Sequence, residues 1–294
     1  MPIAISLSGL LASMRCSVDT EVILRIVSPA ATLVEALEPL RSDPSHSAVL
    51  LDIDGTLAPI VRHATDAHVP EATRTLLIEI AKRYRLVGCI SGRRAASARQ
   101  VVAIGSIAYV GNHGGELLRA GATRAEVDPE LEEWAARVRA FAARADTAEL
   151  QRLRVRGEDK YAIAAFHWRG APDEDAAASA VREIAARAQE AGLAVHWGRK
   201  VLEVRPPVVL DKSLGVRALL DGEGSAFAAA LYAGDDTTDL DAFRGLRALE
   251  DAGNVGRAVC IAVRSEEAPQ ELIDRADLAI DGPDGVRELL EALL

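Results

Sequence analysis

Short apolar runs alternate with segments of helical periodicity in the first half of the chain. Residues 47–53 (SAVLLDI), 85–91 (RLVGCIS) and 107–112 (IAYVGN) are continuous apolar runs of the length that is typical of strands buried on both faces. Residues 70–84 and 93–102, which lie between these runs, have helical spacing. This strand–helix alternation predicts a parallel sheet with helices on both of its faces.

The same alternation returns in the last third of the chain. Residues 230–235 and 258–263 are apolar runs that predict strands. Residues 211–220, 238–246 and 284–294 have helical spacing. The two parts together predict the α/β fold class, with a Rossmann-like parallel sheet as the core.

The segment between these two parts has a different pattern. Residues 128–145 and 172–192 predict long helices, whereas residues 152–157 and 160–169 alternate as antiparallel strands do. Residues 193–206 predict a β-hairpin around a glycine-containing turn. We therefore expect a separate α+β domain inserted into the core. The predicted organisation is a helical extension at residues 1–46, a core at residues 47–112 and 206–294, and an inserted cap domain at residues 113–205.

Composition narrows the class of protein. Of the 294 residues, 49% are hydrophobic and 27% are charged, which is ordinary for a globular protein and excludes global disorder. The 34 Lys and Arg residues against 44 Asp and Glu residues give a net charge of −10, so sequence-independent binding to nucleic acid is not expected. No apolar run approaches the roughly 18 residues that a membrane span needs, so no membrane partner is expected.

The cysteines and the N-terminal residues indicate the cellular compartment in which the protein is expected. The three cysteines are far apart and form no C-x-x-C pair, which favours a reduced, cytoplasmic protein without a zinc site. Residues 1–17 include a short apolar stretch without a basic leading region, so a secretion signal is not favoured. We expect a monomer.

Two acidic motifs follow predicted strands. Asp52 and Asp54 come at the end of the first strand and point the same way along an extended segment, and Asp235 and Asp236 follow a later strand. Because the carboxyl ends of parallel strands meet at one sheet edge, the motifs predict an oxygen-ligand site suited to Mg²⁺. Neither motif has the spacing of an EF-hand loop. The alternatives are a solvated turn at the first motif and a helix N-cap at the second, and capping is compatible with metal binding.

Two further elements complete the series. Ser91, Gly92 and Arg93 directly follow the second strand, where a hydroxyl and backbone N–H groups at a helix N-terminus can bind an anion, or where Ser91 can simply cap the helix. Lys212 lies near the start of a predicted helix. A lysine taken alone is usually a solvated surface residue, so its position in the series is what singles it out.

In this order, the motifs resemble those of the haloacid dehalogenase superfamily of phosphatases. The resemblance implies a Mg²⁺-dependent phosphomonoesterase with Asp52 as nucleophile and Asp54 as general acid and base. It implies Asp52, Asp54, Asp235 and Asp236 as metal ligands. A carboxylate that attacks an anionic phosphate faces a repulsion of about 4 kcal/mol per charge pair at ~4 Å and an effective dielectric constant near 20. Mg²⁺ and Lys212 would offset this repulsion, and Ser91 with its loop N–H groups would hold the phosphoryl oxygens.

Several peptides also resemble the trehalose-6-phosphate phosphatases. They are GNHGGE (111–116), GEDKYAIAAFHWR (157–169), GRKVLEVRP (198–206) and GDDTTDLDAF (234–243). The resemblance implies that the substrate is trehalose 6-phosphate and that polar residues of the core and cap contact its hydroxyl groups. These residues are Asn112, His113, Glu116, Glu158, Lys160, Lys200 and Glu203. As alternatives, Lys200 and Glu203 could form a surface ion pair, and Glu158 and Lys160 a solvated strand end.

Three other activities stay open at this point. One is a different sugar phosphatase of the same superfamily, acting on sucrose phosphate or mannosyl-phosphoglycerate. Another is a phosphotransferase such as a phosphomutase, which would use the same nucleophile with a sugar acceptor. The third is a non-catalytic phosphosugar-binding module, which the presence of Asp52, Asp54, Asp235 and Lys212 disfavours.

Overall fold

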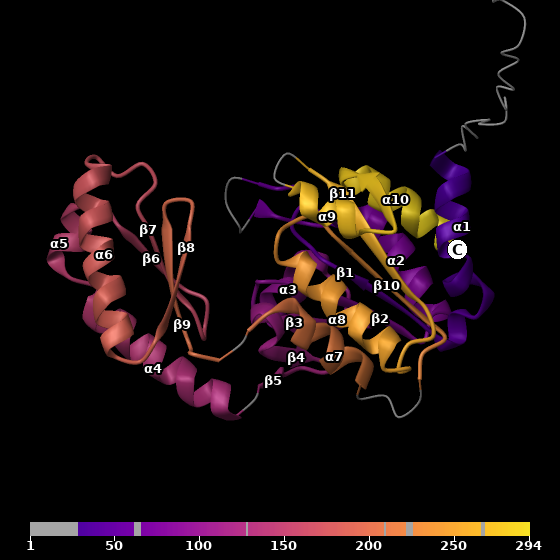
Figure 1. The fold of residues 1–294 in the computed structure, drawn as a ribbon, viewed down its shortest axis with the longest axis horizontal. Helices are drawn as coiled ribbons and strands as arrows, with labels where there is room; N and C mark the ends of the chain where they lie inside the picture. The colour runs from indigo at the N-terminus through magenta and orange to yellow at the C-terminus, as the bar shows by residue number, and fades with distance from the viewer. Residues whose placement is uncertain (1–28, 62–65, 128, 209, 222–225, 266–267) are drawn as a thin grey trace, which may run out of the picture.

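A computed structural model describes residues 29–61, 66–127, 129–208, 210–221, 226–265 and 268–294. It contains a large core and a smaller cap, which lie side by side along the long axis of the molecule (Figure 1). The apolar N-terminal stretch that bears on secretion lies outside the described residues.

The core is built on an eight-stranded sheet in the order β12-β11-β10-β1-β2-β3-β4-β5. The first six strands in this order are parallel to their neighbours, as the alternating pattern predicts. The last two are antiparallel, so the sheet continues to Val127, past the boundary at residue 112 that the sequence predicts. The strands are β1 (Ser47–Leu51), β2 (Leu86–Ile90), β3 (Ala108–Gly111), β4 (Glu116–Leu118), β5 (Glu126–Val127), β10 (Ala229–Gly234), β11 (Ala258–Arg264) and β12 (Leu278–Asp281).

Helices cover both faces of this sheet. One face packs against α1 (Pro29–Ser42), α2 (Glu71–Arg83), α3 (Ala95–Val102) and α10 (Gly282–Leu293). The other packs against α7 (Lys212–Leu220), α8 (Asp239–Asp251) and α9 (Gln270–Arg275). Along β1, Val49 and Leu51 point into the first layer, while Ala48 and Leu50 point into the second. All four are fully buried, which explains the unbroken apolar run in the sequence.

The cap contains a four-stranded antiparallel sheet in the order β6-β7-β9-β8. Its strands are β6 (Arg156–Asp159), β7 (Ala164–His167), β8 (Ala194–Gly198) and β9 (Val201–Arg205). Its helices α4 (Pro129–Ala145), α5 (Ala148–Arg152) and α6 (Glu174–Glu190) supply a separate apolar core with one face of the sheet. Alternation along β9 buries Leu202 and Val204 in that core and turns Glu203 to the opposite face. In Figure 1, the cap sheet lies between α6 and the core.

The elements absent from the sequence prediction are all short. The strands β4, β5 and β12 and the helices α5 and α9 have six residues or fewer. Two single 3₁₀ turns, Pro44–His46 and Asn112–Gly114, also escape the pattern. Segments of this length are too short to display a period, so pairing and packing decide them. Within the described part of the chain, no helix has the length and apolar character that crossing a membrane requires.

Candidate active site

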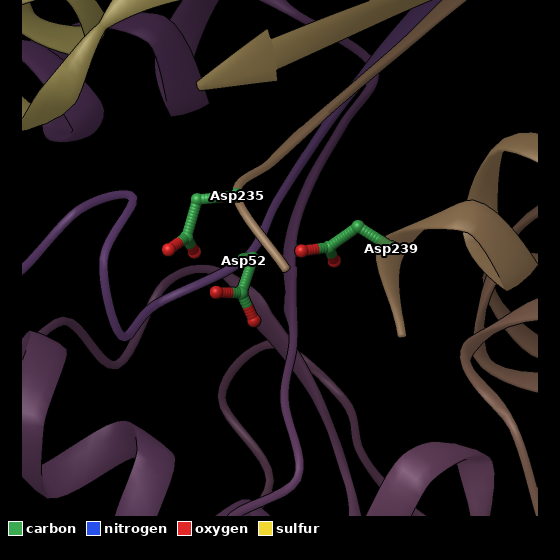
Figure 2. Close-up of side chains that lie close together, drawn as sticks. All are labelled: Asp52, Asp235 and Asp239. Atoms are coloured by element: carbon green, nitrogen blue, oxygen red, sulfur yellow. The ribbon is translucent and has the colours of Figure 1, made fainter. Parts of the chain in front are cut away.

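The two acidic motifs meet because their strands are neighbours. β1 and β10 pair in parallel with Leu51 opposite Ala233, and the Asp52 N–H donates to the Ala233 carbonyl at 2.8 Å. Asp52 and Asp235 therefore leave adjacent strand ends at the same sheet edge. Together with Asp239, they place carboxylate oxygens within 4.8 Å of one another (Figure 2). All three side chains are buried.

Two glycines of the motifs allow this close approach. Gly55 has a φ of +87°, and a Cβ atom there would lie 2.0 Å from Oδ2 of Asp235. A Cβ atom at Gly234 would lie 2.2 Å from Cγ of Asp239. A side chain at either position would displace a carboxylate, so glycine beside the acidic residues is a steric requirement of the cluster.

Lys212 is the only described cation inside the cluster. It is the first residue of α7 and is 2% exposed. Its Nζ donates to Oδ1 of Asp52 and to Oδ1 of Asp239, both at 2.7 Å. Asp239 also accepts a hydrogen bond from the hydroxyl of Tyr232 at 2.5 Å. The solvated-lysine alternative therefore does not apply to Lys212.

The charges in the cluster do not balance, because three carboxylates face one ammonium group. Burial raises the pKa of Asp52 and of Asp239, and burial with the neighbouring Asp239 raises the pKa of Asp235 to about 7. For Lys212, burial works toward a lower pKa, but Asp239 and Asp52 raise the pKa well above its ordinary value. A divalent cation would supply the missing positive charge. Buried carboxylate oxygens are also the donors that a hard cation prefers, so the residues present fit such an ion.

Asp54 and Asp236 line the cleft but stand outside the buried group of three. Arg93 donates to Asp54 through Nε at 2.6 Å and through its terminal nitrogen at 2.7 Å. Asp236 accepts from the N–H and the hydroxyl of Thr238 at 2.8 and 2.6 Å, so it stabilises the turn before α8, whose N-cap is Thr238 instead of Asp236. Asp239, which the sequence analysis placed within the motif but assigned no role, takes the inner position. In the sequence, its position at the start of the helix predicted over residues 238–246 is the signal that could have found it. In the structure, Asp239 is the first residue of α8 and accepts from Tyr232 on β10.

The predicted anion-binding segment lies beside the cluster. Ser91, Gly92 and Arg93 all line the cleft, and Oγ of Ser91 accepts from the N–H of Arg93 at 3.1 Å. A Cβ atom at Gly92 would lie 2.9 Å from the ring of His113, so the absent side chain makes room for that ring. Burial lowers the pKa of His113 to about 4, and the charges of Lys212 and Arg205 act in the same direction. The ring is therefore neutral at pH 7 and can both donate and accept hydrogen bonds.

The cleft between core and cap has a volume of about 960 Å³. The cap contributes Glu158, Lys160 and Glu203, which the sequence analysis named. The register of the cap sheet places these side chains in line across its strands. Glu158 lies opposite Ala165, Ala165 opposite Glu203, and Glu203 opposite His196. Cross-strand neighbours share a face, so these residues form one row toward the core.

The row is held by ion pairs. Lys160 Nζ lies 3.0 Å from Oε1 of Glu203, and Arg205 binds the other oxygen of Glu203. Burial alone would raise the pKa of Glu203, but Lys160 and Arg205 lower it to about 2. His196 and Arg205 line the cleft although the sequence analysis gave them no role. Strand alternation from Glu203 could have found Arg205.

Three predicted sugar-binding residues do not line this cleft. Asn112 and Glu116 are buried, and Asn112 Nδ2 donates to Oε1 of Glu116 at 2.8 Å. Glu116 also accepts from the N–H of Ala95 at 2.9 Å, at the start of α3. Lys200 binds Glu174 on α6 at 2.5 Å. The ion pair foreseen as an alternative for Lys200 is thus present, but with Glu174 instead of Glu203.

Two residues next to the cluster leave it intact. Ser213, which follows Lys212, donates from its N–H to Oδ1 of Asp211, the residue that caps α7. Leu240, which follows Asp239, packs against the apolar layer of α7 and α8. Neither side chain takes a position among the buried carboxylates.

Comparisons of the sequence with known proteins all match trehalose-phosphate phosphatases in the cases that follow. The trehalose-phosphatase family model matches residues 50–276. The trehalose-phosphate phosphatase of Mycobacterium avium is 32% identical over 256 residues, which cover 84% of this chain and 62% of that protein. A trehalose 6-phosphate phosphatase of Zea mays is 30% identical over 264 residues, which cover 83% of this chain and 69% of that protein. The chain spans only half of the length of the matched Mycobacterium marinum protein, at 50%.

Solved structures agree on the fold. The trehalose-6-phosphate phosphatase of Aspergillus fumigatus aligns with a TM-score of 0.59 at 23% identity, covering 91% of this chain and 98% of that chain. A haloacid dehalogenase-like hydrolase from Bacteroides thetaiotaomicron aligns with a TM-score of 0.57 at 16% identity, covering 85% and 100%. Since the family model also matches most of the sequence, this chain belongs to the trehalose-phosphatase family and has the fold of the haloacid dehalogenase superfamily.

Proposed function

We propose that this chain is a Mg²⁺-dependent phosphomonoesterase that hydrolyses trehalose 6-phosphate to trehalose and phosphate through an aspartyl-phosphate intermediate. The observation that carries the proposal is the buried carboxylate of Asp52, held by Lys212 beside two further carboxylates, at a cleft that the polar face of the cap overlooks. Membership of the trehalose-phosphatase family supports the choice of substrate.

In the first half-reaction, Asp52 attacks phosphorus. Its Oδ1 is bound to Lys212, while Oδ2 accepts no hydrogen bond from a described residue and is the oxygen placed to attack. The new Oδ2–P bond forms as the ester P–O bond breaks, and Asp54 donates a proton to the departing sugar oxygen. The ammonium group of Lys212 keeps Asp52 in place and reduces its repulsion with the phosphate.

Asp54 can act in this step only when its oxygens can reach the substrate, and Arg93 controls that access. In this structure, the guanidinium group binds both oxygens of Asp54. The same planar group can bind two oxygens of a phosphate. An entering phosphate ester therefore competes for Arg93, and its arrival frees the oxygens of Asp54 to face the departing sugar oxygen.

In the second half-reaction, Asp54 takes a proton from water, the water oxygen attacks phosphorus, and the bond to Asp52 breaks to release phosphate. The buried carboxylates of Asp52, Asp235 and Asp239 would hold Mg²⁺, with Asp54 and Asp236 adjoining on the cleft side. When bound, Mg²⁺ would neutralise negative charge on the phosphoryl oxygens. Ser91 and the neighbouring N–H groups would hold the remaining oxygens.

The cap provides the proposed sugar contacts. Glu158, Lys160 and Glu203 offer charged acceptors and donors to the hydroxyl groups of a disaccharide, and the neutral ring of His113 faces them from the core. Sucrose phosphate and mannosyl-phosphoglycerate, which carry similar hydroxyl groups, are the alternative substrates. The monomeric state and the cytoplasmic location stay predictions from the sequence.

Phosphate release from a panel of phosphosugars tests the function. We expect kcat/KM for trehalose 6-phosphate to exceed that for sucrose phosphate, mannosyl-phosphoglycerate and glucose 6-phosphate by roughly tenfold or more, since buried polar groups left unpaired penalise a mismatched sugar. Removal of metal with EDTA should abolish release, and added Mg²⁺ should restore it. A higher kcat/KM for another sugar would contradict the substrate, and full activity in EDTA would contradict the metal.

Lysines on the cap provide a matched pair of variants. Replacing Lys160 with Met should raise KM for trehalose 6-phosphate roughly tenfold, about 1.4 kcal/mol of binding, because a charged donor to the sugar is lost. kcat should change less than twofold. Replacing Lys200 with Met should alter neither constant, because Lys200 binds Glu174 outside the cleft. Steady-state kinetics decide the matter, and equal effects of the two substitutions would refute the assignment.

A further inference from the structure

Asn112 and Glu116 belong to the GNHGGE motif, yet both are buried outside the cleft. Glu116 is 2% exposed, and its Oε1 accepts from Asn112 while its Oε2 accepts from the N–H of Ala95. The one charged group that reaches Glu116 among the described residues is Arg94, whose Nε lies 3.3 Å from Oε1. The buried carboxylate therefore holds the guanidinium end of the Arg94 side chain.

The same guanidinium group of Arg94 also contacts the cap. Its guanidinium carbon lies 4.8 Å from the centre of the Tyr161 ring, and that of Arg139 lies 5.1 Å from the same centre. Arg94 belongs to the core, whereas Tyr161 and Arg139 belong to the cap. Of the cation–π contacts between described residues, the one made by Arg94 joins the two domains.

Tyr161 occupies a conformation that needs support. Its φ of +73° is unusual for a bulky residue, which adopts it only where the surroundings impose it. The Tyr161 N–H donates to Oδ1 of Asp159 at 2.7 Å, and the Lys160 N–H donates to the carbonyl of Ile163 at 2.8 Å. The ring packs in a small apolar cluster with Leu131, near the start of α4, and Leu210, just before α7, close to where the chain passes between core and cap.

We infer that Asn112, Glu116, Arg94 and Tyr161 form a clamp that sets the orientation of the cap over the active site. Tyr161 is then a positioning residue, because it touches no reacting atom. Its neighbours in the sequence, Lys160 and Glu158, both line the cleft, so the position of Tyr161 determines where they lie. The inference rests on the proposed function for its substrate. It assigns the buried part of the GNHGGE motif to domain orientation instead of sugar contact.

Kinetics of two Tyr161 variants provide the first test. Tyr161→Leu removes the aromatic face and should raise KM for trehalose 6-phosphate about fivefold, because the cap contacts are no longer preorganised. Tyr161→Phe keeps the ring and should behave as the wild type. With p-nitrophenyl phosphate, which offers no sugar to the cap, all three proteins should have kcat/KM within twofold. A loss with Phe equal to that with Leu, or an equal loss for both substrates, would overturn the clamp.

Distances between spin labels test the clamp without any substrate. Cysteines that replace Arg182 on α6 and Glu288 on α10, both exposed, take one label on each domain in a Cys16→Ser background, since Cys89 and Cys260 are buried. Pulsed electron paramagnetic resonance should give one narrow distance distribution for the wild type and Tyr161→Phe, and a broader or shifted one for Tyr161→Leu and Glu116→Gln.

The possible outcomes separate the two proposals. An unchanged distribution in Tyr161→Leu refutes the clamp, even if trehalose 6-phosphate proves to be the substrate. Weaker binding of that sugar by Glu116→Gln with an unchanged distribution would return Glu116 to direct sugar contact. If the wild type does not hydrolyse trehalose 6-phosphate but the distributions differ as expected, the substrate is wrong and the clamp stands.

Discussion

Replacing Asp52 with Asn is expected to lower kcat for trehalose 6-phosphate by at least about 10³-fold, or roughly 4 kcal/mol of transition-state stabilisation. The amide cannot form the acyl phosphate, so the loss should appear in kcat and persist at saturating substrate. Acid quenching during turnover should trap a phosphorylated Asp52 peptide in the wild type, detectable by mass spectrometry, and none in the variant.

The Asn variant should remain folded. It is isosteric, and it removes one of three buried carboxylates that lie around a single lysine, of which Lys212 pairs with only two, so thermal unfolding of the metal-free protein should occur at the same temperature or higher. Asp281→Asn is the matched control, because its side chain is 82% exposed. Turnover within tenfold of the wild type in Asp52→Asn would sink the nucleophile assignment.

Replacing Lys212 with Met is expected to lower both stability and activity. Lys212 is 2% exposed, and its loss leaves the carboxylates of Asp52 and Asp239 buried without a cation. Removal of one partner of a buried ion pair costs about 3–5 kcal/mol, so urea denaturation in EDTA should give a free energy of unfolding lower by that amount. kcat should fall at least about 10²-fold, since Asp52 loses the group that holds it.

The stability loss in Lys212→Met should depend on pH. Burial raises the pKa of Asp52 and of Asp239, and the ammonium group of Lys212 opposes that rise. Without Lys212, the folded protein binds protons that the unfolded chain does not bind above pH ~4. Its stability therefore falls as the pH rises, and the deficit relative to the wild type should be larger at pH 8 than at pH 5.5.

An exposed lysine serves as the control for this experiment. Lys82 on α2 has a 66% exposed side chain and pairs with Glu79. Lys82→Met should change the free energy of unfolding by less than about 0.5 kcal/mol at either pH. A Lys212→Met variant that resembles Lys82→Met, or a deficit that grows as the pH falls, would contradict the buried charge balance described here.

The sequence identified the core of the fold because its signals are local. A strand such as β1 that is buried on both faces must be apolar throughout, so its position can be recognised without knowledge of its neighbours. The Asp-x-Asp-Gly motif after it is equally local, since the positive φ of Gly55 is a property of the backbone turn that directly follows Asp52 and Asp54. The order of the motifs then indicated a family, and the resemblance to that family predicted the substrate class, which composition and periodicity do not specify.

Contacts between segments that are distant in the chain could not be predicted from the sequence. Asp239 joins Asp52 and Asp235 only because α8 begins beside the end of β10, and Lys200 turns toward Glu174 because α6 packs next to the β8–β9 hairpin. Charged residues of the same type therefore lie in different environments: Lys212 is buried among carboxylates, whereas Lys200 pairs with Glu174 outside the cleft. The direction in which a charged side chain points depends on sheet register and on which helix covers it.

By itself, the sequence determined the alternation of buried strands and amphipathic helices, the inserted second domain, and the acidic motifs at strand ends, because backbone periodicity and turn-forming residues are encoded over a few neighbouring residues. Only the tertiary structure decided which carboxylates share Lys212, which cap residues face the cleft, and that Glu116 lies under Arg94. Those outcomes depend on burial and charge pairing between residues far apart in the chain, and such pairing exists only once the layers have packed.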